Sequence, residues 1–100
     1  MINVEIAVVP VGTSSTSISD FVAESEKALG KYPDLSYKIT AMSTEIEGKN
    51  IEEIFEVLKQ MHLAQINKGA SRVQTSIRID DRRDKENTMS EKVASVRAKI

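Results

Sequence analysis

The side chains that could carry out chemistry in this chain are few, and they exclude several classes of enzyme. The sequence holds one histidine, His62, and no cysteine, which rules out catalytic thiols, disulfides and cysteine-bound metals. A Ser-His-Asp arrangement could use only His62. Because His62 falls on an apolar helical stripe, a packed histidine with hydrogen-bonded ring nitrogens is favoured over a ligand or a proton carrier. The sequence therefore predicts no catalytic site.

A metal site in this chain would have to consist of oxygen ligands alone. The available carboxylates are Glu45, Glu47, Asp80, Asp81 and Asp84. Their spacing does not match the loop of an EF-hand. We therefore predict no metal site and no cofactor.

The segment from Val9 to Thr13 joins a predicted strand to a predicted helix and is a candidate ligand loop. Gly12 lets backbone amides approach a ligand, and the helix N-terminus that follows favours anionic or polar groups. The segment lacks a GxGxxG or P-loop pattern, so no nucleotide site is predicted. An ordinary turn with capping hydroxyls explains the same residues equally simply.

A second candidate surface is the segment from Thr40 to Thr44, which places hydroxyls on both sides of Met42. The polarizable thioether of a methionine packs well against a flat ring. The same residues could form an ordinary hairpin.

A third candidate is a basic group interleaved with aspartates near the C-terminal end. Its members are Arg72, Arg78, Arg82, Arg83 and Lys85, and the aspartates are Asp80, Asp81 and Asp84. The mixture of signs favours an ion-pair cluster, solvated or between subunits, over a phosphate clamp.

Two amphipathic helices among four strands must position these residues. Strands are expected at 2–9, 36–42, 44–47 and 72–80. Apolar spacing predicts one helix from a Ser17 cap to about Lys31 and another from an Asn50 cap to Gly69. A capping box of Thr88 and Glu91 opens a third helix. The order β-α-β-β-α-β predicts a single α+β domain over 1–100, a ferredoxin-like sandwich with a four-stranded antiparallel sheet plus a C-terminal helix.

Strand alternation assigns the two faces of this sheet. The side chains expected to meet the helices are Ile2, Val4, Ile6, Val8, Tyr37, Ile39, Ala41, Val73, Thr75, Ile77 and Ile79. The outer face should carry Asn3, Glu5, Ala7, Lys38, Thr40, Met42, Gln74, Ser76, Arg78 and Asp80. That face mixes small residues, paired charges and a methionine, which suits a second sheet stacked upon it. We therefore expect a homo-oligomer in which two sheets pair face to face about a two-fold axis.

Charge and hydropathy limit the partners and the location. The net charge is −1 and the pI is near 5.8, so the chain offers no electrostatic footprint for nucleic acid. No stretch approaches the roughly 20 apolar residues of a membrane span, and the first residues do not form a signal peptide. We expect a cytoplasmic protein with no nucleic-acid or membrane partner.

Three stretches taken together resemble the small thiamine-binding-protein family. They are Val8–Thr13 with Ser17–Ser19, Tyr37–Gly48, and Arg72–Lys85. The resemblance covers nearly the whole chain and extends to His62 and Gly69. It implies a ferredoxin-like fold, assembly into dimers and commonly tetramers, and binding of thiamine or its hydroxymethylpyrimidine part without catalysis. The family usually has glycine where this chain has Ser43, so a turn that needs positive φ would be strained here.

The resemblance directs attention to particular residues as ligand contacts. They are Gly12, Thr13, Thr40, Met42, Thr44, Glu47, Arg72 and Arg78. Glu47 would accept from the exocyclic amine or pair with the thiazolium cation, and its alternative role is an ion pair at the rim. Arg72 or Arg78 could hold an anion such as a phosphate on the ligand. The alternative function is a regulatory or interaction module of ferredoxin-like type, binding another small ligand at the subunit interface.

Overall fold

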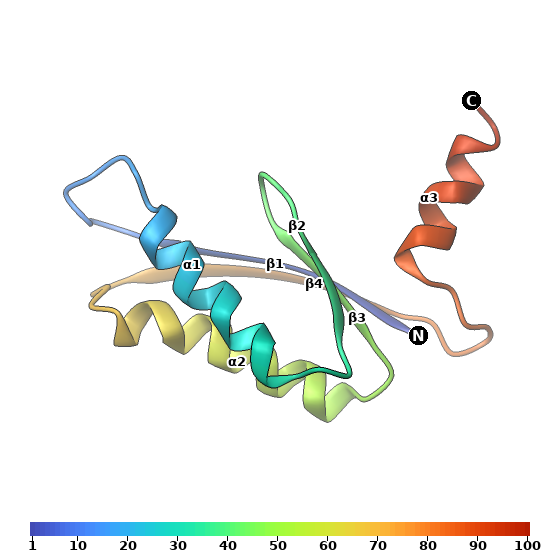
Figure 1. Ribbon diagram of the computed structural model, residues 1–100, viewed down its shortest axis with the longest axis horizontal. Helices are drawn as coiled ribbons and strands as arrows, with labels where there is room; N and C mark the ends of the chain where they lie inside the picture. The colour runs from blue at the N-terminus through green and yellow to red at the C-terminus, as the bar shows by residue number, and fades with distance from the viewer.

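The protein is built on one four-stranded antiparallel sheet, described by a computed structural model over residues 1–100. The strands are β1 (Ile2–Pro10), β2 (Ser36–Ile39), β3 (Thr44–Gly48) and β4 (Val73–Asp81). They lie in the order β2-β3-β1-β4, and every neighbouring pair is antiparallel. This order confirms the predicted ferredoxin-like topology (Figure 1).

Two of the three α-helices cover one side of the sheet. They are α1 (Ser19–Lys27), which continues as the 3-10 turn η1 (Ala28–Lys31), and α2 (Ile51–Asn67). The third, α3 (Met89–Arg97), stands apart from them near the N-terminal end of β1 (Figure 1). None of these helices combines the length and the apolar character needed to cross a membrane.

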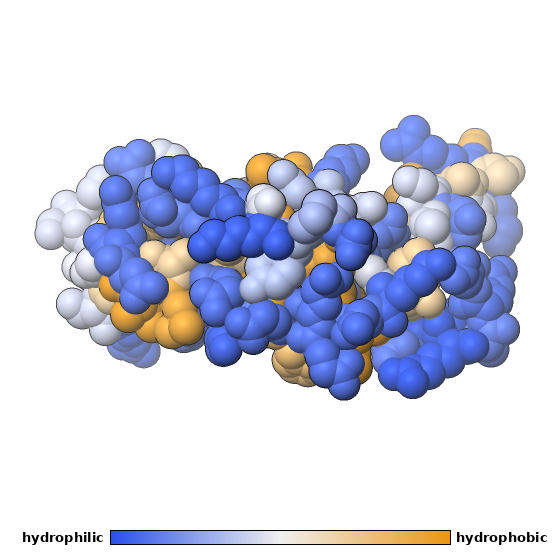
Figure 2. All heavy atoms as spheres, turned by 60° about the horizontal axis from the view of Figure 1, so that its bottom comes forward, coloured by the Kyte–Doolittle hydropathy of each residue, from blue (hydrophilic) through white to orange (hydrophobic).

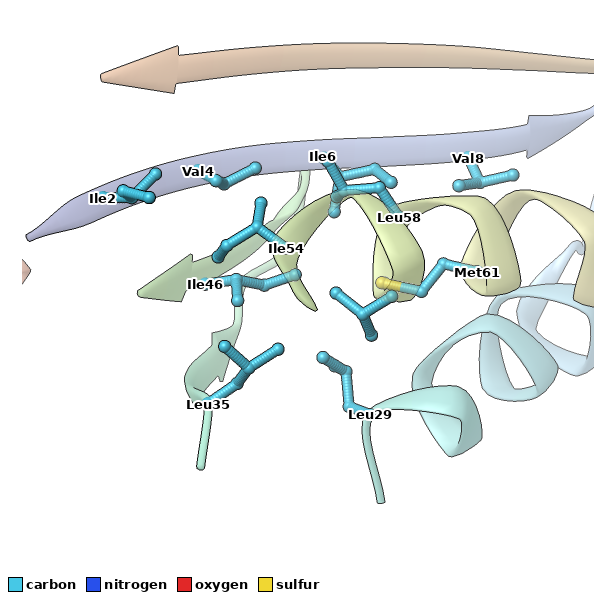
Figure 3. Packing of buried hydrophobic residues seen from close by; sticks show 11 residues of the cluster. Ile2, Val4, Ile6, Val8, Leu29, Leu35, Ile46, Ile54, Leu58 and Met61 are labelled. Carbon is cyan, nitrogen blue, oxygen red and sulfur yellow. The ribbon is translucent and has the colours of Figure 1, made fainter. Parts of the chain in front are cut away.

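The hydrophobic core lies between the sheet and the pair α1 and α2. Alternate residues of β1 point toward α2 and are buried (Figure 3). The buried cluster consists of Ile2, Val4, Ile6, Val8, Leu29, Leu35, Ile46, Ile54, Val57, Leu58 and Met61. Gly48 ends β3 against this cluster, and a Cβ atom there would lie 2.5 Å from Cδ2 of Leu35. The close approach explains why a residue without a side chain occupies this position.

Two polar residues of the predicted helical stripes also lie in the core. Gln65 is fully buried, and its Nε2 donates to the Val8 carbonyl at 2.8 Å and to the Ser25 hydroxyl at 3.1 Å. The Ser25 hydroxyl donates in turn to the Met61 carbonyl at 2.7 Å. These bonds tie β1, α1 and α2 together and satisfy the Ser25 hydroxyl and the Gln65 amide nitrogen, as buried polar groups require. Gln65 Oε1 has no partner.

The helix ends match the predicted caps except at α1. The Asn50 side chain accepts the Glu53 N–H, and Thr88 with Glu91 forms a complete capping box. The prediction that Ser17 caps α1 was wrong, because Ile18 occupies the N-cap position and no side chain bonds there. Ser17 instead belongs to the loop before α1, where its N–H donates to the Ser15 hydroxyl at 3.1 Å.

Strand β2 is shorter than predicted. It ends at Ile39, where Thr40 donates its N–H to the Ser43 carbonyl at 2.8 Å and closes a tight turn. Ala41 and Met42 therefore belong to the turn, so the prediction that Ala41 faces the helices was wrong. Both residues are exposed.

The two edge strands are less covered than predicted. Register with Ile46 places Tyr37 on the helix side of the sheet, and register with Val4 and Ile6 does the same for Ile79 and Ile77. They nevertheless remain between 38% and 48% exposed, because an edge strand has a neighbour on one flank only. Separate apolar patches reach the surface among the hydrophilic residues on the face that Figure 2 shows.

Candidate functional site

An open groove of about 710 Å³ lies between the outer face of the sheet and α3. Its sheet wall includes Asn3, Glu5, Lys38, Glu45, Glu47 and Arg78. Its helix wall includes Met89, Val93 and Arg97. The volume falls within the range of small-molecule sites, which is roughly 300–1,000 Å³. The groove therefore combines apolar surface from α3 with charged and amide groups from all four strands.

Helix α3 is attached to the sheet by polar contacts rather than by a buried face. The Met89 N–H donates to Oε2 of Glu47 at 2.8 Å, and Lys92 Nζ lies 2.7 Å from Oδ2 of Asp80. No residue of α3 is buried, and Val93 is 51% exposed. A carboxylate at a helix N-terminus is favourable because the helix dipole leaves partial positive charge there. Glu47 therefore anchors α3, and the rim ion pair considered from the sequence is not formed.

Asn3 is the polar residue at the floor of the groove. It pairs in register with Glu47 on β3 and with Asp80 on β4, and it is only 8% exposed. Neither Oδ1 nor Nδ2 of its side chain has a hydrogen-bond partner. An unsatisfied buried polar group costs roughly 1–3 kcal/mol. Asn3 thus keeps an unused acceptor and an unused donor beneath the groove, and both atoms are shielded from solvent.

The charges beside Asn3 form a carboxylate pair that is flanked by a cation on each side. Glu5 lies directly opposite Glu45 on β3 and opposite Arg78 on β4. Arg78 Nη1 is 3.9 Å from Oε1 of Glu5, and Lys38 lies opposite Glu45 on β2. Like charges on facing strands destabilise a sheet, so the two cations offset the carboxylate pair. The groove can therefore meet both a cationic and an anionic group of a ligand.

Two arginines that follow β4 form ion pairs with aspartates of the same segment. Arg82 Nε donates to Asp84 at 2.7 Å, and Arg83 Nη2 donates to Asp81 at 2.8 Å. These guanidinium hydrogen bonds lower the pKa of Asp84 and of Asp81 below their usual values. Both pairs involve partly or largely exposed side chains. This is the ion-pair cluster favoured from the sequence, and it leaves Arg72 and Arg78 as the arginines of interest.

The structure distributes the predicted ligand contacts over three places. Glu47 and Arg78 line the groove. Thr40, Met42 and Thr44 lie in or beside the turn between β2 and β3. Gly12, Thr13 and Arg72 lie where β1 ends and β4 begins, which is the end of these two strands away from the groove. Gly12 follows Asn3 by nine residues, which spans about 30 Å of extended chain. One small ligand cannot touch both Gly12 and Glu47 of the same protomer.

The three hairpin residues differ in what their side chains already do. The Thr40 hydroxyl donates to the Ser43 carbonyl at 2.7 Å. Thr44 is buried, and its hydroxyl donates to the carboxylate of Glu26. Met42 is 86% exposed. The methionine is therefore the hairpin side chain that is free to meet another surface.

Ser43 causes no backbone strain in this turn. The one residue other than glycine with positive φ is Ser14, at 62°. The Ser43 hydroxyl donates to Oε2 of Glu5 at 3.2 Å. Serine at this position therefore contributes a hydroxyl to a carboxylate of the groove.

The remaining residues considered from the sequence, the Gly12 loop and His62, are held by hydrogen bonds within the protomer. Gly12 has φ 78°, and the neighbouring Thr13 hydroxyl donates to the Ser15 carbonyl at 3.0 Å. The Val11 N–H donates to the Arg72 carbonyl at 2.8 Å, which holds Arg72 beside this loop. His62 Nδ1 lies 2.7 Å from the Thr75 hydroxyl, in agreement with a packed, hydrogen-bonded histidine.

Sequence reasoning did not single out Asn3 or the α3 residues as candidate contacts. Alternation along β1 placed Asn3 on the outer face, but strand alternation does not indicate what covers that face. One signal was present, namely an amide between apolar neighbours in a strand whose next two outward residues, Glu5 and Ala7, are charged or small.

Comparison with known proteins identifies the family. The sequence model of a family described as thiamine-binding protein matches residues 4–97. The chain belongs to this thiamine-binding protein family. It is 42% identical over 100 residues to a UPF0045 protein of Methanothermobacter thermautotrophicus, and the match covers 100% of both chains. It is 41% identical over 95 residues to the UPF0045 protein YqgV of Bacillus subtilis, covering 92% of this chain and 90% of the relative.

Solved structures of similar proteins share the fold. The hypothetical protein MJ1052 of Methanocaldococcus jannaschii gives a TM-score of 0.85 at 34% identity, covering 95% of this chain and 94% of that one. A Thermotoga maritima protein named for thiamine biosynthesis or salvage gives a TM-score of 0.76 and covers 95% of this chain and 97% of that one. At 22% identity the second likeness shows the fold alone. The resemblance noted from the sequence is thereby confirmed, and the family name is that of a small-molecule binder.

Proposed function

We propose that this member of the family is a non-catalytic, cytoplasmic protein that binds thiamine or its hydroxymethylpyrimidine part and works as a homodimer or homotetramer. The observation that carries the proposal is the unpaired amide of Asn3 at the floor of the groove, beside the carboxylate of Glu47. Family membership supports the ligand class.

An aminopyrimidine matches the unused groups of the groove. Its edge presents an exocyclic amine as donor next to a ring nitrogen as acceptor, and an asparagine side chain can accept from the one and donate to the other. Glu5 or Glu45 can attract the thiazolium cation. Met89 and Val93 supply apolar surface for the ring. A phosphate on the ligand would meet Arg78 or Lys38 at the rim.

The remaining predicted contacts belong, in this proposal, to an assembly of subunits. Gly12, Thr13, Arg72, Thr40 and Met42 lie outside the groove of their own protomer. Thr44 also lies outside it, but its side chain is buried on the helix side and bonds to Glu26, so stacking of outer faces does not expose it to a ligand. A second outer face stacked on the first about a two-fold axis could bring the other residues over the groove. The 86% exposure of Met42 supports this arrangement, because a large apolar side chain on a turn gains from being covered.

Calorimetry on ligand-free protein tests the proposal. We expect the wild-type chain to bind thiamine or hydroxymethylpyrimidine, and Asn3→Leu to weaken that binding at least tenfold. Asn67→Leu is the matched control, because Asn67 is exposed at the end of α2 and lies outside the groove. Absence of heat from the wild-type chain at millimolar thiamine would contradict the proposal. Light scattering at micromolar concentration tests the oligomeric state, and a clean monomer mass would contradict the proposed homodimer or homotetramer.

The cations of the groove support a second candidate function. Lys38, Arg78, Lys92 and Arg97 line it together with three glutamates, so an anionic ligand is also accommodated. In this alternative the protein is a regulatory or interaction module of ferredoxin-like type. A thermal-shift screen separates the two, since an amino acid or a nucleotide that outranks thiamine would select the alternative.

A further inference from the structure

Three outward-facing residues form a row across the sheet at one end of the groove. Asn3 of β1 pairs in register with Glu47 of β3 on one side and with Asp80 of β4 on the other. Neighbouring strands lie about 4.8 Å apart, so the two acidic residues stand roughly 10 Å apart with Asn3 between them. An element that is bonded to both carboxylates must therefore pass over Asn3.

The first turn of α3 is bonded to both of these carboxylates. The Met89 N–H donates to Oε2 of Glu47 at 2.8 Å, and Lys92 Nζ donates to Oδ2 of Asp80 at 2.7 Å. Met89 and Lys92 are three residues apart and therefore lie on the same face of the helix. In Figure 1, α3 accordingly stands near the N-terminal end of β1. Its position explains why both amide atoms of Asn3 are shielded from solvent on the face away from the core.

These two contacts are the only hydrogen bonds or ion pairs that join α3 to the sheet. The Lys92 and Asp80 side chains are 34% and 64% exposed, and an ion pair between exposed groups is weak and screened by salt. No residue of α3 is buried. The helix is therefore held to the sheet far less firmly than the core elements are held to one another.

Helix α3 can leave the sheet without losing its own structure. The capping box between Thr88 and Glu91 lies entirely within the start of the helix. The segment that joins α3 to β4 contains no helix or strand. Movement about this segment would break the two contacts with the sheet and leave the hydrogen bonds inside α3 intact.

We propose that α3 is a lid over Asn3, and that a ligand reaches the Asn3 amide only when the contacts of Met89 with Glu47 and of Lys92 with Asp80 open together. The lid then closes again over the bound ring, on which Met89 and Val93 form the helix wall of the groove. The part of this inference that concerns the ligand rests on the proposed function, whereas the movement of the lid does not.

A lid has a kinetic signature that a simple contact residue lacks. When opening precedes both entry and exit, weaker lid contacts raise the association and dissociation rates by the same factor. The dissociation constant then stays nearly constant. Loss of a residue that only contacts the ligand acts mainly on the dissociation rate.

Two substitutions loosen the lid without altering the sheet. Lys92→Met removes the ion pair and keeps an apolar side chain, and Lys99→Met removes an exposed lysine beyond α3 as its control. Met89→Pro removes the N–H that bonds to Glu47, and proline is well accommodated at the first position of a helix. The preceding Thr88 already has the extended backbone that proline requires, with φ −73° and ψ 161°. Met89→Leu keeps the N–H and is the matched control.

Thiol labelling measures the opening of the lid without any ligand, because the chain has no cysteine of its own. In Asn3→Cys the thiol should react slowly with a small alkylating reagent. Adding Lys92→Met or Met89→Pro should accelerate that reaction roughly fivefold, whereas the Lys99→Met and Met89→Leu controls should not change it. Val4→Cys places the thiol one residue along β1, on the helix side, where Val4 is 3% exposed. Its labelling requires opening of the core and should be the same in all these backgrounds.

Equal labelling of Asn3→Cys with and without the lid substitutions would overturn the proposal. Equal acceleration of Val4→Cys would do the same, because α3 would then belong to the core. Stopped-flow binding of thiamine completes the test, and in Lys92→Met both rates should rise by a common factor. Rates that equal those of the wild-type chain would show that α3 does not control entry. If labelling responds as expected but the wild-type chain binds no thiamine, the lid is supported and the proposed ligand is contradicted.

Discussion

The two faces of the sheet differ in what covers them and in how far their buried polar residues are bonded. On the helix side Gln65 is paired through Nε2, although its Oε1 has no partner. On the helix side, Ile2, Val4, Ile6 and Val8 pack against α2 (Figure 3) and are at most 7% exposed. On the outer side, Asn3 is nearly as buried, but neither of its amide atoms is paired. The comparison teaches that one face supplies the stability of the fold, whereas the other keeps a buried amide whose two polar atoms are both unused, the feature on which the proposed ligand site rests.

The helices that cover the two faces show the same contrast. Helix α2 buries five residues against the sheet and α1. Helix α3 buries none and depends on the Glu47 carboxylate and on the Lys92–Asp80 contact. A change in α2 should therefore affect global unfolding, and a change in α3 should act locally.

The largest effect is expected from truncating the core side. Ile54 is fully buried, and Ile54→Ala should lower the free energy of unfolding by about 2–5 kcal/mol because it removes buried methyl groups and leaves a cavity. Urea denaturation measures the change. Ile39→Ala makes the same substitution at a residue that is 56% exposed and should cost less than about 1 kcal/mol. Equal losses would mean that the helix side is not where the stability lies.

The second-largest loss of stability is expected from removing the buried hydrogen bonds between α1 and α2. Ser25→Ala removes the hydroxyl that donates to the Met61 carbonyl and accepts from Gln65. We expect a loss of about 1–2 kcal/mol in unfolding free energy, measured by thermal and urea denaturation. Ser19→Ala, at an exposed position of the same helix, serves as control and should change stability by less than about 0.5 kcal/mol. A neutral Ser25→Ala would show that apolar packing alone holds α1 to α2.

On the outer face, we expect a substitution to raise the free energy of unfolding instead of lowering it. Asn3→Leu replaces an unpaired buried amide by an apolar side chain, so the free energy of unfolding should rise by about 1 kcal/mol even though ligand binding is lost. Urea denaturation of the ligand-free protein measures the rise. A fall of similar size would mean that the Asn3 amide already has partners in the folded protein, which would remove the contrast between the faces.

The smallest global effect is expected at α3. Thr88→Ala removes the N-cap hydroxyl, which accepts the Glu91 N–H at 3.1 Å and should contribute about 1 kcal/mol to the helix. Because α3 buries no residue, global unfolding should stay unchanged. Hydrogen exchange of the α3 amides should become roughly fivefold faster, with the α2 amides as internal control. A lowered global stability would show that α3 belongs to the cooperative core.

Much of the fold was predictable because it depends on local pattern. The apolar spacing of α2, its Asn50 cap and the capping box at Thr88 are properties of short segments, and each was found where the sequence placed it. The exceptions depend on competing contacts. Ser17 has a good capping side chain, but the preceding loop engages its backbone and α1 begins one residue later without a cap.

The candidate site was less accessible to sequence reasoning, because it depends on distances between segments. Glu47 and Arg78 could be placed on the outer side, yet their separation from Gly12 by about 30 Å follows only from how the strands align. Family resemblance indicates which residues matter in the group as a whole. It does not indicate which of them one protomer brings together.

By itself, the sequence determined the order of the elements, the N-caps of α2 and α3, the face to which the residues of β1 and β4 belong and the family of the chain. These features depend on periodicity and on residue type over a few positions. Only the tertiary structure decided that α3 crosses the outer face and that Asn3 is buried beneath it without partners. These outcomes depend on the packing of elements far apart in the chain, which no local pattern specifies.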